Sequence, residues 1–189
     1  MTEKKDISEH PQCLHPAVER FVLQWGEMGG SWGVNRSVSQ IHALLYVSER
    51  PLTAEDIAAV LGIARSNVST SLKELLGWDL IRRVPIRGDR REHFEAETDV
   101  WEMVRRIGAG RKAREIDPAL AALRGCVALA DADKTIHPVA ARRLNDMLAF
   151  TETVDGWYGQ MLTVPKAKLA MILRLGAKII KFIPTGKAG

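Results

Sequence analysis

The sequence predicts a mainly α-helical protein that contains one small β-hairpin. Three observations support this fold class. Apolar residues recur at helical spacing through most of the chain. Gly62 separates two short helical segments, and the β-like runs 80–86 and 91–96 flank a turn that contains Gly88. The predicted order is therefore two leading helices, a tight helix pair, a hairpin and a helical region.

Length and charge limit the possible organisation. A chain of 189 residues suffices for one ample domain, or for a small domain with a helical extension. We expect a loose tail at 1–15, a helix and a tight-helix module at 16–98, and a helical dimerisation or effector region at 99–189. The net charge is +4, but no Asp or Glu follows Asp155 whereas six Lys or Arg do. Local clusters, and not the overall charge, must therefore identify a polyanionic partner.

Two amphipathic helices are predicted first. Val18, Phe21, Val22, Trp25 and Met28 lie at helical spacing after Pro16, and the pair Gly29–Gly30 is expected to end that helix. A second helix is expected over 37–48, because Ile41, Leu44 and Leu45 share a face and Pro51 follows.

The segment from Thr53 onward has the pattern of a helix-turn-helix. Thr53 is a suitable N-cap for a helix that runs to Leu61, and a second helix follows to about residue 78. Two helices that cross sharply need a small residue in the first, glycine at the turn and an aliphatic residue in the second. Ala58, Gly62 and Val68 occupy those offsets.

Polar side chains on the second helix suit the major groove of DNA. Arginine can recognise guanine, asparagine can recognise adenine, and hydroxyl groups adapt to either base. The hairpin that follows carries five arginines and one acid between Arg82 and Arg91, which suits the minor groove or phosphates. Asp89 is expected to orient an arginine. The predicted DNA-binding residues are Arg65, Ser66, Asn67, Ser69, Thr70, Lys73, Arg87, Arg90 and Arg91.

Helices are predicted throughout the rest of the chain. Thr98 could cap the first of them, and Pro118, Pro138 and Pro165 stand where later helices would begin. The expected ranges are 99–113, 118–131, 137–153 and 165–182. The last of these is amphipathic and is expected to serve dimerisation, with a membrane-surface helix as the alternative.

The segment from about residue 15 to about residue 100 resembles the MarR-type winged-helix regulators, particularly their GbsR-like branch. The resemblance lies in SWGVNRSVSQIHALLYVSERPL, in LTAEDIAAVLGIARSNVSTSLKELLGWDLIRR and in GDRREHFEAET. It implies a homodimer whose N- and C-terminal helices form the interface and whose two winged modules bind a pseudo-palindromic operator in double-stranded DNA. It also implies repression, release by a small-molecule effector, and choline as one effector known in the branch.

Other functions can be considered for the same residues. A winged helix can act as a protein-docking adaptor without contacting DNA. No phosphate-binding glycine loop, GxSxG or HExxH motif is present, so an enzyme is not predicted, and neither is a cofactor. Trp25, Trp32 and Tyr46 could form an aromatic cage for a quaternary ammonium ligand, although packing residues are the alternative.

Cysteines and hydropathy restrict the setting. Cys13 and Cys126 form no CxxC motif, Cys126 is expected to be a buried thiol, and His10, Cys13 and His15 have no fourth ligand for a metal. No secretory signal and no run of 18 apolar residues is present, so no membrane association is expected. The sequence predicts a cytoplasmic, nucleoid-associated protein of a bacterium or archaeon.

Overall fold

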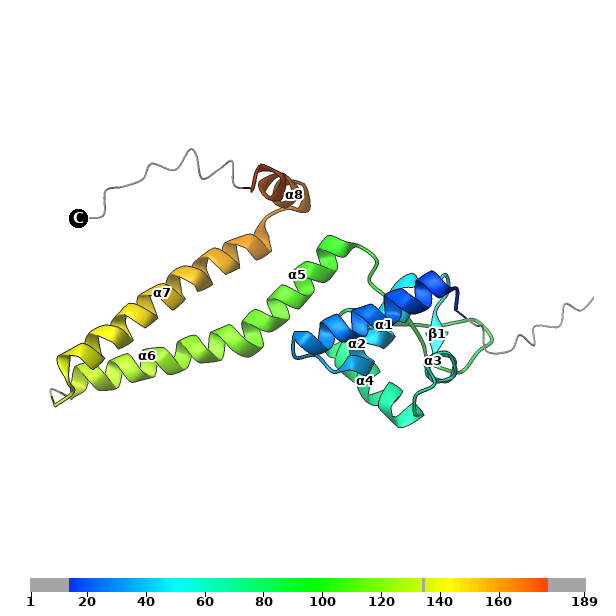
Figure 1. Cartoon of the computed structure of the whole chain (residues 1–189), viewed down its shortest axis with the longest axis horizontal. Coiled ribbons are helices and arrows are strands. Elements are labelled where there is room, and N and C mark those ends of the chain that lie inside the picture. The colour runs from blue at the N-terminus through cyan, green and yellow to red at the C-terminus, as the bar shows by residue number, and fades with distance from the viewer. Residues whose placement is uncertain (1–13, 134, 177–189) are drawn as a thin grey trace, which may run out of the picture. The chain divides into compact units, whose positions relative to one another are not determined.

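The computed structural model describes residues 14–133 and 135–176, which form two compact units (Figure 1). The winged-helix unit extends to Ile107, and the helical unit begins at Gly108. No helix among the described residues is long and apolar enough to span a membrane. The predicted tail lies almost wholly outside the described residues.

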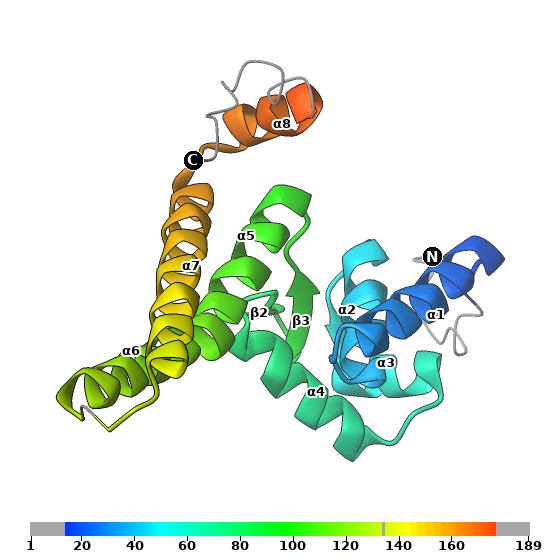
Figure 2. The ribbon, with the colours of Figure 1, turned by 60° about the vertical axis from the view of Figure 1, so that its left-hand side comes forward.

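The winged-helix unit contains five helices, the last of which continues into the helical unit, and three short strands. In chain order these are α1 (Pro16–Ser31), α2 (Arg36–Val47), β1 (Leu52–Thr53), α3 (Ala54–Leu61), α4 (Arg65–Gly77), β2 (Ile81–Val84), β3 (His93–Ala96) and α5 (Val100–Arg111). The mainly helical fold with a small hairpin is therefore confirmed, and Figure 2 shows the strands beside α4.

The prediction that Gly29–Gly30 ends the first helix is wrong. Helix α1 continues through both glycines to Ser31, and the chain turns only at Gly33, whose φ is +77°. Gly29 is buried against α2, where a Cβ atom would lie 1.9 Å from the Ser39 Oγ. Position 29 requires a glycine because α1 and α2 pack closely there, and not because the backbone needs the conformational freedom of glycine.

A three-stranded antiparallel sheet in the order β1-β3-β2 forms the wing. Phe94 of β3 pairs with Leu52 on one side and with Arg83 on the other. Strand β1 was not predicted, and the hairpin strands are shorter than the runs 80–86 and 91–96 suggested. Pro85 directly follows β2, where its missing N–H cannot extend the ladder.

One apolar core joins the helices to this sheet. Its members from different elements include Ile41, Ile57, Val68, Leu75 and Phe94, all at most 4% exposed. The apolar side of each helix therefore faces this core, and the opposite side of α4 remains in solvent.

Helix α5 begins at a cap one residue beyond the predicted one. Asp99, and not Thr98, accepts the backbone N–H groups of Trp101 and Glu102, at 2.9 and 3.3 Å. A carboxylate is a strong acceptor for the free N–H groups of a first turn, and here it displaces the Thr hydroxyl from that role.

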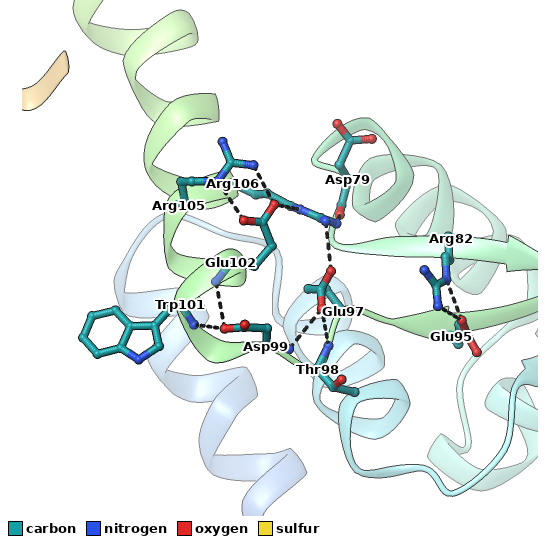
Figure 3. Close-up of polar contacts among 10 residues, drawn as sticks. All are labelled: Asp79, Arg82, Glu95, Glu97, Thr98, Asp99, Trp101, Glu102, Arg105 and Arg106. Atoms are coloured by element: carbon teal, nitrogen blue, oxygen red, sulfur yellow. Dashed lines mark hydrogen bonds and ion pairs between the residues drawn. The ribbon is translucent and has the colours of Figure 1, made fainter. Parts of the chain in front are cut away.

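Arg106 fastens α5 to the rest of the unit (Figure 3). Its guanidinium donates to the Glu97 carboxylate at 2.9 Å, to Glu102 at 2.8 Å and to the backbone carbonyl of Asp79. Arg105 also donates to Glu102. The hydrogen bonds from Arg105 and, to a smaller extent, from Arg106 lower the pKa of Glu102 to about 2. The start of α5 is thereby joined to the ends of α4 and β3.

The helical unit holds the end of α5, a π-helical turn η1 (Lys112–Ile116), α6 (Asp117–Ala132), α7 (Pro138–Thr163) and α8 (Lys166–Leu175). The break expected before Pro118 is absent, because Pro118 sits in the first turn of α6 and η1 continues the helix into it. Helix α7 extends ten residues beyond the predicted end. The predicted residues after Gly176 lie outside the described chain.

Helices α6 and α7 form a hairpin within the helical unit (Figure 2). Leu120 and Val127 of α6 are buried there, and Arg124 donates to Glu152 of α7 at 2.9 Å. The Tyr158 hydroxyl donates to the Gly108 carbonyl at 3.2 Å. Cys126 is exposed on α6, so the prediction of a buried thiol is wrong.

Candidate nucleic-acid interface

A capping box positions the first helix of the helix-turn-helix. The Thr53 hydroxyl accepts the Asp56 N–H at 3.1 Å, and the Asp56 carboxylate accepts the Thr53 N–H at 3.0 Å. These bonds occupy two backbone donors that a helix start leaves free. They also lower the pKa of the Asp56 carboxyl, against the effect of its partial burial.

The turn between α3 and α4 has the predicted packing. Gly62 adopts φ +64°, a left-handed conformation that ends α3. Val68 is fully buried beneath the helix pair, and Ala58 packs against the same core. The small residue, the glycine and the aliphatic residue thus fix the angle at which α4 leaves α3.

The exposed side of α4 presents most of the predicted contact residues. Arg65 stands in the first turn, and its guanidinium pairs with Glu55 of α3 at 2.5 Å. The Thr70 hydroxyl donates back to the Ser66 carbonyl at 3.1 Å. The exposed predicted residues on this helix are Arg65, Ser66, Asn67, Ser69, Thr70 and Lys73.

Asn67 of this set is hydrogen-bonded to the neighbouring helix α2. Its amide donates to the Ser37 hydroxyl of α2 at 2.9 Å, and its carbonyl accepts from Ser71 at 3.4 Å. A bidentate contact with adenine needs both of these atoms. These two bonds anchor α4 to α2, and they leave the amide one further N–H and one further oxygen lone pair.

The wing loop is held by a clasp between Asp89 and Arg91. The Asp89 carboxylate accepts the Arg91 backbone N–H at 2.9 Å and its guanidinium at 2.5 and 3.0 Å. These hydrogen bonds hold the pKa of Asp89 well below its usual range. The buried His93 donates to the Arg91 carbonyl at 3.0 Å and supports the loop from inside. The expected role of Asp89, to orient an arginine, matches this geometry.

Two further wing arginines are less constrained. Arg87 and Arg90 are exposed on either side of Gly88, whose φ of +85° makes the turn. Neither has an acidic partner within the described part of the chain. Their guanidinium groups are therefore available to an external anion.

Three residues near this surface were not among the predicted contacts. Arg83 of β2 pairs with Glu92 at 2.8 Å, and Glu55 pairs with Arg65. The arginine richness of the hairpin was visible in the sequence. The acidic partners were not, since each lies on a neighbouring element whose position only the fold determines.

The three aromatic residues predicted to bind a ligand are placed differently from one another. Trp25 and Tyr46 both lie beside Phe21, with ring centroids 5.5 Å and 6.4 Å from its ring, at the α1–α2 contact. Trp32 lies two turns after Trp25 and is 62% exposed. Packing thus accounts for Trp25 and Tyr46, whereas Trp32 presents its ring to solvent.

No group of three or more His, Cys, Asp or Glu is placed to hold a metal within residues 14–133 and 135–176. The spacing of His10, Cys13 and His15 cannot be compared, because the first two lie outside these ranges.

Comparison with known proteins agrees with the geometry. A model of the MarR family matches residues 32–92, which contain α2, β1, α3, α4, β2 and the wing loop before β3. Residues 32–92 of this chain are thus similar to the MarR family. The predicted resemblance is therefore confirmed, and the matched segment includes every residue of the proposed contact surface on α4 and in the wing.

The similarity to some relatives extends beyond the matched segment. The HTH-type transcriptional repressor GbsR of Bacillus subtilis is 25% identical over 94% of this chain and 98% of its own length. The HTH-type transcriptional regulator MmpR5 of Mycobacterium tuberculosis is 29% identical over 74% of this chain and 82% of its own. A solved structure described as a transcriptional regulator has a TM-score of 0.60 and 26% identity, and covers 78% of this chain and 96% of that one.

Some similarities are shorter. The alignments with the Bacillus subtilis regulators YvaV and OpcR span only about half of those proteins, 50% and 49%. The chain therefore spans about half the length of these two relatives.

Proposed function

We propose that this protein is a sequence-specific DNA-binding transcriptional regulator that acts as a homodimeric repressor. The observation that supports it best is the shared exposure of the polar side of α4 and the arginines of the wing in one MarR-type module. A relative that covers nearly the whole chain, GbsR, is named as a transcriptional repressor. Such a regulator would act in the bacterial or archaeal cytoplasm, on the nucleoid.

In this mechanism residues 16–98 bind DNA, and residues 99–189 dimerise and respond to an effector. Two α4 helices enter successive major grooves of a pseudo-palindromic operator, with half-sites about 10 bp apart from centre to centre. Each wing then reaches the flanking minor groove, where Arg87, Arg90 and Arg91 meet strong negative potential.

The exposed apolar face of α7 supports dimerisation. Met147, Phe150 and Trp157 are 54%, 66% and 59% exposed, and their spacing places them on one side of the helix. An apolar stripe of this kind is typical of a surface that a second copy covers. Replacing Phe150 by Asp should yield monomers in sedimentation equilibrium, whereas an unchanged dimer would place the interface elsewhere.

Replacing Arg90 by Ala tests the DNA-binding function. If its guanidinium neutralises one phosphate, the slope of log affinity against log salt falls by about 0.9 for duplexes of any sequence. Fluorescence anisotropy with labelled genomic fragments measures this slope. The matched control is Arg142→Ala, which removes the same charge from an exposed arginine of α7.

The outcomes separate the two candidate functions. Equal slopes for both variants would remove the wing from the phosphate contacts. Wild-type protein without salt-dependent DNA binding would instead favour the protein-docking adaptor.

Adding choline to the protein–DNA complex tests a small-molecule effector. Release that is unaltered in Trp32→Ala would exclude that ring from the effector site.

A further inference from the structure

A hollow lies between α4 and the wing strands. Its accessible volume is about 250 Å³, and its floor is apolar, formed by Leu72 and Leu76 of α4 and Phe94 of β3. The rim carries four cations, namely Arg65 and Lys73 of α4, Arg83 of β2 and Arg91 of the wing loop. The same rim holds only two acids, Glu55 and Glu92.

The two acids are engaged with two of these cations. Glu55 binds Arg65 at 2.5 Å, and Glu92 binds Arg83 at 2.8 Å. Both guanidinium groups are well exposed, at 72% and 57% of their side chains. Ion pairs at such exposure contribute at most about 1 kcal/mol, so another anion can replace them. Lys73 has no carboxylate partner among the described residues.

The geometry of a winged helix on DNA places a phosphate backbone above this hollow. When α4 occupies a major groove and the wing occupies the adjacent minor groove, the sugar–phosphate strand that separates those grooves runs between them. The strip of protein between α4 and the wing is the hollow itself. A guanidinium prefers phosphate because it can donate two parallel hydrogen bonds to its oxygens.

We propose that this hollow seats a backbone phosphate of the DNA strand between the two grooves, held by Arg65, Lys73 and Arg83. Glu55 and Glu92 are displaceable counter-ions that occupy two of these cations until the phosphate replaces them. The inference rests on the proposed DNA-binding function and adds Arg83, Glu55 and Glu92 to it.

The two acids have a consequence for affinity. Every duplex, whatever its sequence, must displace them, so they weaken sequence-independent binding. Because an operator must displace them too, the ratio of operator to non-specific affinity is unchanged, and base contacts from α4 supply a larger share of the total affinity for the operator.

Strand β2 supplies a matched pair of variants for the test. Arg82 and Arg83 are neighbours on it, so their side chains leave opposite faces of the strand. Arg83 lines the hollow, whereas Arg82 pairs across the sheet with Glu95 at 2.5 Å. Replacing either arginine by Ala removes one positive charge, and only one of the two would remove a phosphate ligand.

The probe is a fluorescein-labelled duplex of about 30 bp and mixed sequence, titrated by anisotropy between about 50 and about 200 mM salt. Over this range, Arg83→Ala should lower the salt slope by about 0.9, so its affinity falls about 3.5-fold less than that of wild type. Arg82→Ala should keep the wild-type slope. Equal slopes for the two variants would overturn the phosphate site.

The counter-ion role is tested by a gain of binding, which misfolding cannot imitate. Glu92→Gln should raise the affinity for this duplex by up to about fivefold at low salt, in line with the strength of an exposed ion pair. The control Glu95→Gln, on the other pair, should leave the affinity unchanged. Equal affinities for wild type and both glutamine variants would overturn the role of Glu92. If wild-type protein shows no salt-dependent binding to the duplex, the proposed function fails together with the site.

Discussion

Helix α1 packs so closely on α2 that adding one methyl group at Gly29 should destabilise the winged-helix unit. A Cβ atom there would lie 1.9 Å from the Ser39 Oγ and 2.6 Å from the Ser39 Cβ, well inside the 3.4 Å at which ordinary contact begins. Ser39 is buried and belongs to α2, so it cannot turn into solvent. The helices must move apart or the side chain must strain.

The magnitude follows from comparison with Gly30, the next residue of α1. An alanine is favoured over glycine in a helix by up to about 1 kcal/mol, and this gain applies to both positions. At Gly30 a Cβ atom would meet nothing within 4 Å. Overpacking a core by one carbon costs about 1 to 3 kcal/mol, so Gly29→Ala should be less stable than Gly30→Ala by that amount.

Urea denaturation followed by tryptophan fluorescence measures the difference, because Trp25 lies one turn before Gly29. A double variant that also carries Ser39→Gly should recover most of the loss, since both clashing atoms are then absent. Equal urea midpoints for Gly29→Ala and Gly30→Ala would refute the close α1–α2 contact. Failure of Ser39→Gly to recover stability would show that the strain lies elsewhere.

Two further predictions concern the same unit. Thr53→Ala removes the acceptor of the Asp56 N–H and should lower the free energy of unfolding by about 1 kcal/mol, whereas Thr53→Ser should retain it; equal urea midpoints would argue against the capping box. Burial lowers the pKa of His42 from 6.5 to about 4, so the unfolded chain binds the proton more readily than the folded one. The free energy of unfolding should therefore fall as the pH drops from 6.5 towards 4, by about 1.4 kcal/mol for each unit of pH. Thermal melts of His42→Leu should lack this part of the pH dependence, and an identical profile in wild type would contradict the buried neutral imidazole.

The features that could be predicted from the sequence are those that local residues determine. Gly62 has to adopt a left-handed backbone, and Val68 has to lie beneath the helix pair, so both leave a pattern at fixed spacing. The arginines of the hairpin are adjacent in the chain. Their number was therefore evident without knowledge of the fold.

Other features depend on partners that are distant in sequence. Strand β1 has only two residues and forms because it pairs with β3. Two residues are too few to show a periodicity in the sequence. Gly29 resembles a helix stop in the sequence, yet its lack of a side chain serves the contact with Ser39. The pairing of Asn67 with Ser37 joins residues 30 positions apart, and only the packing of α2 on α4 brings them together.

Strand β2 is the outer strand on one side of the wing sheet, and its charge has a consequence for solubility. An outer strand exposes unpaired N–H and C=O groups that another chain could extend into a larger sheet. Arg82 and Arg83 place positive charge on both faces of this four-residue strand, and Pro85 ends it. Two copies that approached edge to edge would bring like charges together in this way. We therefore expect the charged side chains of β2, which are Arg82 and Arg83, to disfavour the addition of a further strand at this edge.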